Sequence, residues 1–282
     1  MPVSPLISAV DLNEQLKGGR GIRLLDVRYR LDQPDGRADH LAAHLPGAVY
    51  VDLDTELATL GEPSEGRHPL PSRATLQDAA RRWGLDDGDP VAIYDDYRSV
   101  AAARAWWLLR AAGVEDVRVL DGGLAAWRAA GLPLEEGEVI PPRGSVTLGE
   151  PAGGLRIDEA ASWPEHGVLL DARAPERYRG ETEPYDPIPG HIPGAVNLPA
   201  DAVLHGDGFA SPAEIRAAFA AVGATADAPL AAYCGSGLNA AHTVLAGASA
   251  GLDVAVYSGS WSEWSNTPGR PVATGAEPDG RD

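Results

Sequence analysis

Short apolar runs alternate along this 282-residue chain with longer stretches whose apolar positions recur at helical spacing. The runs at 91–94, 117–120 and 230–233 have the length and composition of buried strands, and the stretch 240–248 has those of a helix. Strands that alternate with helices favour a parallel sheet covered by helices on both faces. The pattern therefore predicts an α/β protein.

The same series of motifs occurs twice. Four segments of the first half recur in the second half in the same order, namely 23–30 and 168–180, 44–54 and 191–201, 91–113 and 230–251, and 117–127 and 254–264. The matches include "HLPGAV" beside "HIPGAV" and "RLLDVR" beside "VLLDAR". A repeat of this order indicates two tandem domains, each with a central, mainly parallel sheet.

A segment rich in Gly and Pro separates the two halves. Residues 136–153, "EGEVIPPRGSVTLGEPAG", have no sustained periodicity, which is typical of a linker. We therefore expect an N-terminal domain at 1–135 and a C-terminal domain at 154–282.

The only cysteine, Cys234, lies between the apolar run 230–233 and the predicted helix. A lone thiol is usually a small core residue, but these neighbours indicate a different role. At a strand-to-helix turn, free N–H groups of the helix start point toward the loop, and the helix dipole favours the thiolate. Gly235 and Gly237 allow the dihedral angles by which successive amides face one point. The stretch predicts an anion cradle around a sulfur nucleophile.

The corresponding loop of the first half has no cysteine. Asp95 aligns with Cys234, and residues 96–98 align with 235–237. An aspartate cannot hold a transferable sulfur, and without glycines this loop is not expected to form the same amide cradle. We expect the first domain to be non-catalytic, acting as a scaffold or lending side chains to the second.

Charge and composition exclude several classes of protein. A formal net charge of −18 argues against partners such as nucleic acid or anionic membrane surfaces. The seven histidines and single cysteine show no metal-ligand spacing, so we expect no metal. The N-terminus lacks the pattern of a secretory signal and no apolar stretch is long enough to span a bilayer, so we expect a cytoplasmic protein.

Taken together, "LLDVR", "HLPGA", "LLDAR", "GHIPGAVN", "YCGSG" and "GSWSEW" make the chain resemble the tandem-domain rhodanese family of thiosulfate and 3-mercaptopyruvate sulfurtransferases. In that family the reactive cysteine opens a loop between a strand and a helix. The loop here comprises Cys234, Gly235, Ser236, Gly237, Leu238 and Asn239.

The resemblance implies a two-step sulfur relay without a cofactor. The Cys234 thiolate would take the outer sulfur of a small anionic donor, become a persulfide, and pass that sulfur to cyanide or a thiol. Backbone amides of the loop would stabilise both the thiolate and the negatively charged outer sulfur of the persulfide. A thioredoxin-like reductant is among the candidate acceptors.

The loop sequence bears on the donor. Family members that prefer thiosulfate resemble Cys-Arg-Lys-Gly at this point, and those that prefer 3-mercaptopyruvate resemble the Cys-Gly-Ser-Gly found here. The resemblance further assigns Asp54, His68 and Ser236 to a proton-transfer group. It assigns Arg177 to the anionic end of the donor.

A second substrate arginine, expected between 180 and 191, has no clear match. Either Arg179 serves, or the site works with one arginine, which leaves thiosulfate open as the donor.

Structural roles are the alternatives for these residues. Asp54 has the sequence context of a helix cap, and Arg177 is expected to pair with Asp171 or Glu176 if it has no role in binding. His68 lies in an insertion peculiar to the first half, which leaves a functional role at the domain interface as open as a structural one.

Two other functions are compatible with a reactive cysteine loop. A Cys-based phosphatase needs an arginine six positions after the cysteine, where this chain has Ala240. A non-enzymatic sulfur carrier would hand its persulfide only to a docked protein. Turnover of small molecules without a partner distinguishes an enzyme from such a carrier.

Overall fold

The fold of this chain is described by a computed structural model for residues 4–280. The chain forms two units. The first comprises the chain through Thr59, Leu70–Ala152 and His205–Phe209. The second comprises Leu60–Pro69, Gly153–Leu204 and the chain from Ala210 onward. Leu60–Pro69, a segment of the first half of the sequence, therefore packs as part of the second unit.

The first unit has a five-stranded sheet in which every pairing is parallel. Its order is β1-β5-β4-β2-β3, with β1 at Leu6–Ile7, β2 at Arg23–Asp26, β3 at Val49–Tyr50, β4 at Val91–Tyr94 and β5 at Val117–Leu120. The strands predicted at 91–94 and 117–120 are confirmed.

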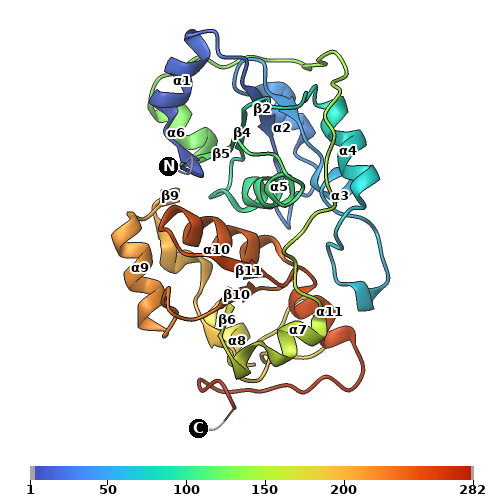
Figure 1. The fold of residues 1–282 in the computed structure, drawn as a ribbon, viewed down its shortest axis with the longest axis vertical. Coiled ribbons are helices and arrows are strands. Elements are labelled where there is room, and N and C mark those ends of the chain that lie inside the picture. The colour runs from blue at the N-terminus through green and yellow to red at the C-terminus, as the bar shows by residue number, and fades with distance from the viewer. Residues whose placement is uncertain (1–3, 281–282) are drawn as a thin grey trace. The chain divides into compact units, whose positions relative to one another are not determined.

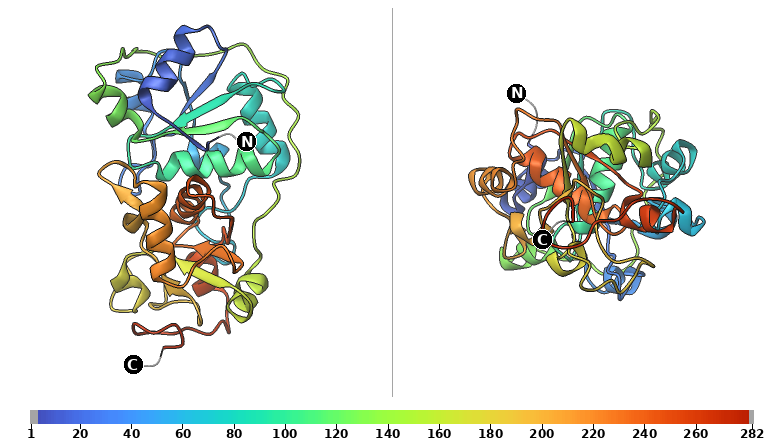
Figure 2. Two further views of the ribbon diagram at one scale, coloured as in Figure 1. Left: turned by 60° about the vertical axis from the view of Figure 1, so that its left-hand side comes forward. Right: turned by 90° about the horizontal axis from the view of Figure 1, so that it is seen from below.

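Helices cover both faces of this sheet, as predicted. They are α1 (Ala9–Lys17), α2 (Arg37–Ala42), α3 (Leu53–Glu56), α4 (Arg73–Arg82), α5 (Val100–Ala111) and α6 (Gly123–Ala129). Leu24 of β2 packs in one core cluster with Leu12 of α1 and Trp127 of α6, and Figure 1 shows these two helices side by side. The next residue, Leu25, is fully buried and points to the opposite face because side chains alternate along a strand. On that side α5 contacts β4 and β5, and the left view of Figure 2 shows α5 lengthwise along the sheet.

The segment predicted as a linker is bound along the first unit. Backbone N–H groups of Gly144, Val146 and Gly149 donate to carbonyls of the first unit at 2.8, 3.0 and 2.9 Å. Figures 1 and 2 show the segment as an extended line beside α4. A side chain at Gly144 would meet the Leu85 carbonyl, so a glycine is required for this close approach.

The second unit repeats the architecture with a four-stranded parallel sheet of order β11-β10-β6-β7. Its strands are β6 (Val168–Asp171), β7 (Val196–Asn197), β10 (Leu230–Tyr233) and β11 (Val254–Val256). The strand predicted at 230–233 is confirmed. A parallel bridge between Gly154 and Val256 occupies the edge that β1 occupies in the first sheet. A separate pair comprises β8 (Leu204–His205) and β9 (Gly208–Phe209).

Helices again lie on both faces of the second sheet. They are α7 (Ile157–Ser162), α8 (Pro175–Tyr178), α9 (Pro212–Ala221), α10 (Leu238–Ser249) and α11 (Ser260–Asn266), with short 3-10 turns η1 (Pro63–Glu65), η2 (Trp163–Glu165) and η3 (Ala200–Val203). Trp261 and Trp264 of α11 are fully buried with Tyr233 of β10 in one cluster. Helix α10 packs against β10 and β11. Within residues 4–280, no helix has the length and apolar character needed to cross a membrane.

Candidate active site

Cys234 lies where strand β10 ends and the chain turns into helix α10, as the sequence predicted. Its side chain is buried, and its Sγ accepts the backbone N–H of Gly237 at 3.1 Å. Gly237 has φ +89°, a left-handed conformation that is strained for other residues, and this turns its N–H toward the sulfur. Leu238 and Asn239 are the first residues of α10, where amides have no acceptor within the helix. The sulfur therefore lies at the positive end of a helix.

The beginning of helix α11 fixes the backbone of this loop. Trp261 N–H donates to the carbonyl of Cys234 and Ser262 N–H to that of Gly235, both at 2.9 Å. The Cys234 N–H donates to Ser260 Oγ at 3.1 Å. These bonds hold the two carbonyls on α11, away from the place where an anion would meet the loop amides.

Arg177, in α8, lies against the loop at Gly235. A methyl group at Gly235 would be 3.3 Å from Arg177 Nη1, so the glycine allows the guanidinium to approach. Its partners are Glu183, at 2.7 Å, and Asp186, at 3.4 Å. The expected structural pairing with Asp171 or Glu176 is therefore wrong, because residues after α8 bring their carboxylates back to the arginine.

These carboxylates belong to a buried chain of alternating charges. Arg173 pairs with Asp171 at 2.6 Å and with Glu183 at 3.3 Å, and Glu183 in turn pairs with Arg177. Glu183 and Asp186 are 2% and 3% exposed. Burial raises the pKa of Asp186, although nearby Arg67 opposes this shift. The charge of Arg177 is therefore balanced by two carboxylates of its own unit.

Arg179, the sequence candidate for a second donor-binding arginine, is paired with an exposed carboxylate. Arg179 pairs through two bonds with Glu181, at 2.7 and 2.8 Å, and the Glu181 side chain is 56% exposed. This pair lies outside the buried charge chain.

His68 and Ser236 are both buried residues of the second unit. The Arg67 N–H, next to His68, donates to Ser262 Oγ at 3.0 Å, while the Ser262 N–H donates to Gly235, next to Ser236. One residue of α11 therefore holds both the Leu60–Pro69 segment and the cysteine loop. This explains why the insertion carrying His68 packs with the second unit.

Asp54 belongs to the first unit, as the second residue of α3. The helix cap is Asp52, whose side chain accepts the N–H of Thr55, so the cap interpretation of Asp54 is wrong. Burial, and then the neighbouring Asp52 carboxylate, raise the pKa of Asp54.

The loop after β4 contradicts the expectation that it lacks an amide cradle. Four backbone N–H groups converge on the Asp95 carboxylate: Tyr97 and Ser99 donate to Oδ1 at 3.0 and 2.9 Å, and Ala101 and Ala102 donate to Oδ2 at 2.9 and 3.0 Å. The cradle forms without glycine because Arg98 and Ser99 adopt positive φ angles of 56° and 62°. The loop is also one residue longer, since α5 begins at Val100, five positions after Asp95, whereas α10 begins four positions after Cys234.

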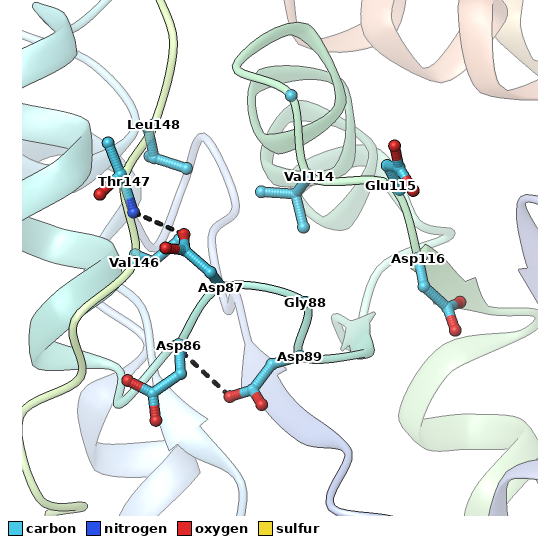
Figure 3. A pocket seen from close by; sticks show the side chains of 11 residues that line it. Asp86, Asp87, Gly88, Asp89, Val114, Glu115, Asp116, Val146, Thr147 and Leu148 are labelled. Atoms are coloured by element: carbon cyan, nitrogen blue, oxygen red, sulfur yellow. Dashed lines mark hydrogen bonds between the residues drawn. The ribbon is translucent and has the colours of Figure 1, made fainter.

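A separate acidic hollow lies at the opposite ends of β4 and β5 (Figure 3). Its volume is about 310 Å³, and it is lined by Asp86, Asp87, Gly88, Asp89, Gly113, Val114, Glu115, Asp116, Val146, Thr147 and Leu148. Its carboxylates bind backbone: Asp87 accepts Thr147 N–H at 2.8 Å, and Asp89 accepts Asp86 N–H at 3.1 Å. Within residues 4–280, no group of His, Cys, Asp and Glu is arranged to hold a metal ion. Asp86 and Asp87 thus bind the backbone of the predicted linker at Ser145 and Thr147.

Comparisons with known proteins agree with this architecture. The Rhodanese-like domain family matches residues 8–130 and 157–267. A Mycobacterium tuberculosis protein that carries the name thiosulfate sulfurtransferase SseB is 47% identical over 96% of this chain and 97% of its own. The 3-mercaptopyruvate sulfurtransferase of Escherichia coli is 34% identical over 89% of this chain and 92% of its own.

A solved structure gives the same result. The crystal structure of SseA from Escherichia coli, described as a 3-mercaptopyruvate sulfotransferase, has a TM-score of 0.82 and 32% identity, covering 92% of this chain and 99% of that one. With two matching domains and relatives aligned over nearly its whole length, this chain belongs to the rhodanese family and is a sulfurtransferase.

Proposed function

We propose that the chain transfers the sulfur atom of 3-mercaptopyruvate to a thiophilic acceptor, and that this atom is held in between as the outer sulfur of a persulfide on Cys234. The observation that carries this proposal is the position of Cys234 Sγ: buried, bonded to the Gly237 N–H, and at the start of α10. A thiolate and a terminal persulfide sulfur are both anions, and this environment favours both. The N–H groups at the start of α10 therefore stabilise both the attacking Cys234 thiolate and the persulfide that it forms.

The first step forms the persulfide. The Cys234 thiolate attacks the sulfur of 3-mercaptopyruvate, an S–S bond forms, and the C–S bond breaks with its electron pair moving to carbon as the enolate of pyruvate. The proton of the donor thiol ends on that carbon, so the products are the persulfide anion and pyruvate. Ser236 and His68, both buried residues of the second unit, are the proposed carriers of this proton.

The second step returns the enzyme to its starting state. Cyanide or a thiolate attacks the outer sulfur, and the Cys234 thiolate leaves. The product is thiocyanate with cyanide and a persulfide with a thiol. A thioredoxin-like protein is a proposed physiological acceptor. The cytoplasm is the proposed location, because a reactive thiol stays reduced there.

The donor follows from the proton requirement. Thiosulfate releases sulfite, which leaves as a stable dianion and needs no proton, whereas pyruvate enolate must be protonated. The proposed proton carriers therefore favour 3-mercaptopyruvate. The relatives divide between the two donors by name, so the donor of this chain has to be measured.

The test is kcat/KM for sulfur transfer to cyanide from each donor, on one preparation and without a partner protein. We expect a preference of about 100-fold or more for 3-mercaptopyruvate, equivalent to about 2.7 kcal/mol in the transition state. The protein mass should rise by one sulfur atom, and Cys234→Ser should lose both turnover and this rise. His68→Asn should slow 3-mercaptopyruvate turnover more than thiosulfate turnover. Retained turnover in Cys234→Ser would refute the mechanism, and a preference for thiosulfate would refute the donor assignment.

A further inference from the structure

A cavity of about 340 Å³ lies in the first unit, at the carboxyl ends of β2 and β4. From β2 the chain continues to β3 at one edge of the sheet, and from β4 it continues to β5 on the other side. The crevice between two such strands is the usual ligand site of a parallel α/β sheet. Strands β6 and β10 have the same arrangement in the second unit, where Cys234 follows β10. The cavity of the first unit therefore lies at the position that corresponds to the cysteine loop.

The lining of this cavity combines an apolar wall with charged side chains of both signs. The wall consists of the alanines at the end of α2 and of residues on one side of α6, namely Ala42, Ala43, Leu124 and Ala125. The charged residues are Arg28, Arg30, Asp39, Asp96 and Arg128. A small molecule in the cavity would meet both kinds of surface.

The charges of the lining balance one another. Arg28 is 4% exposed and is paired with the fully buried Asp26, since its Nη2 lies 2.9 Å from Asp26 Oδ2. The other charged residues of the lining are two arginines and two aspartates, so their net charge is zero. A simple anion would therefore meet as many negative groups as positive ones. A molecule that carries one cationic and one anionic group is complementary to both.

Asp96 has one carboxylate oxygen that the protein does not use. Its Oδ2 accepts Arg30 Nη2 at 2.5 Å, whereas its Oδ1 is buried and accepts no hydrogen bond from residues 4–280. A buried acceptor without a donor is costly, and an ammonium group has three N–H donors to offer. Arg30 is 40% exposed and Arg128 is exposed, so both can present guanidinium N–H groups to a carboxylate.

We propose that this cavity binds an α-amino acid with an apolar side chain. The ammonium group of the ligand donates to Asp96 Oδ1, and its carboxylate accepts from Arg128 and Arg30. Its side chain lies against the apolar wall at Leu124. The site uses residues of the first unit alone, so the inference does not depend on the sulfur chemistry proposed for Cys234.

Calorimetry with L-leucine tests the inference. Two analogues each lack one charged group of this amino acid: 4-methylpentanoate has no ammonium group, and 3-methylbutylamine has no carboxylate. We expect L-leucine to bind with a stoichiometry of about one and each analogue to bind at least about 10-fold more weakly, because each loses a charge-assisted hydrogen bond.

Two variants assign the two charged groups of the ligand. Asp96→Asn should raise the Kd of L-leucine about 10-fold without weakening 4-methylpentanoate, because only the ammonium group loses its partner. Arg128→Ala should raise the Kd of both compounds about 10-fold. Arg143→Ala is the matched control, since Arg143 is an exposed arginine of the first unit outside the lining, and it should leave both Kd values unchanged.

Three results would overturn the inference. The first is an absence of L-leucine binding at millimolar concentration. The second is equal affinity for L-leucine and 4-methylpentanoate, which would identify a simple anion site. The third is a Kd for L-leucine that changes in neither Asp96→Asn nor Arg128→Ala, because the amino acid would then bind elsewhere. The comparison of the analogues uses the unsubstituted protein, so it decides the question even if a variant fails to fold.

Discussion

The loops after β4 and β10 are two versions of one structure. In both, the carbonyl of the first residue accepts a bond from the helix that follows the next strand along the chain. Asp95 accepts Leu124 N–H, and Cys234 accepts Trp261 N–H, each at 2.9 Å. In both, amides at a helix start face the side chain of that first residue. They differ in what fills the cradle, which is a carboxylate of the protein in the first loop and a thiol in the second.

The residue after this first one also differs between the loops, since it is Asp96 in the first loop and Gly235 in the second. In the first loop, Asp96 pairs with Arg30 at 2.5 Å, beside a cavity of about 340 Å³ that Arg28 also lines. In the second, Gly235 has no side chain, and Arg177 lies against it. The first loop thus has a carboxylate at the position where the second has the thiol, and a second carboxylate at the position where the second has a glycine.

Replacing Cys234 with aspartate tests this equivalence with the largest expected effect. Cys234→Asp should lose at least about 1000-fold in sulfur transfer, because a carboxylate cannot carry the sulfur. Its melting temperature should stay close to that of Cys234→Ser, because the N–H groups of the loop can donate to the new carboxylate. A thermal scan beside the activity assay measures both, and an unfolded Cys234→Asp protein would show that the two cradles are not equivalent.

Removing the carboxylate of the first loop should affect stability. Asp95→Ala leaves four N–H groups without their acceptor and should lower the free energy of unfolding by about 4 kcal/mol in urea titration. Asp96→Ala, at the next position, should cost less than about 1 kcal/mol because Arg30 is 40% exposed and can be solvated. Equal effects in the two variants would contradict the cradle.

The same carboxylate predicts a pH dependence. Burial raises the pKa of Asp95 from 3.8 to about 6, although the amide donors oppose the shift. The folded state therefore holds this proton more tightly than the unfolded state. Its contribution to stability is complete below pH 4 and lost as the pH rises through 6.

Asp95→Asn cannot titrate, so it serves as the reference. The unfolding free energy of the unsubstituted protein minus that of this variant should fall by about 2 kcal/mol between pH 4 and 7. A difference that stays constant or rises with pH would show that the four amides dominate over burial.

The smallest effect is expected at Gly235. A methyl group in Gly235→Ala would meet only the end of the Arg177 side chain, at 3.3 and 3.4 Å, which can shift. KM for the donor should rise about threefold with little change in melting temperature. A large loss of stability would mean that the backbone of the loop requires a glycine at position 235. An unchanged KM would show that Arg177 takes no part in binding the donor.

Several features were predictable because they depend on local patterns. Strands β4, β5 and β10 follow from short apolar runs, and the repeat follows from motifs that recur in order. The position of Cys234 between a strand and a helix follows from the composition on either side of it. The helix start then supplies amides to whatever side chain lies there, because the first helical N–H groups have no internal acceptor.

Tertiary structure decided the features that depend on backbone conformation or on distant residues. The cradle around Asp95 requires left-handed dihedral angles at Arg98 and Ser99, which residue type alone does not predict. The partners of Arg177 lie in a loop that folds back on α8, and Arg67 reaches Asp186 from 119 positions away in the sequence. Pairings of this kind depend on how elements pack. The sequence by itself therefore determined the fold and the place of the sulfur nucleophile, and only the tertiary structure decided which charged groups gather beside the cysteine loop.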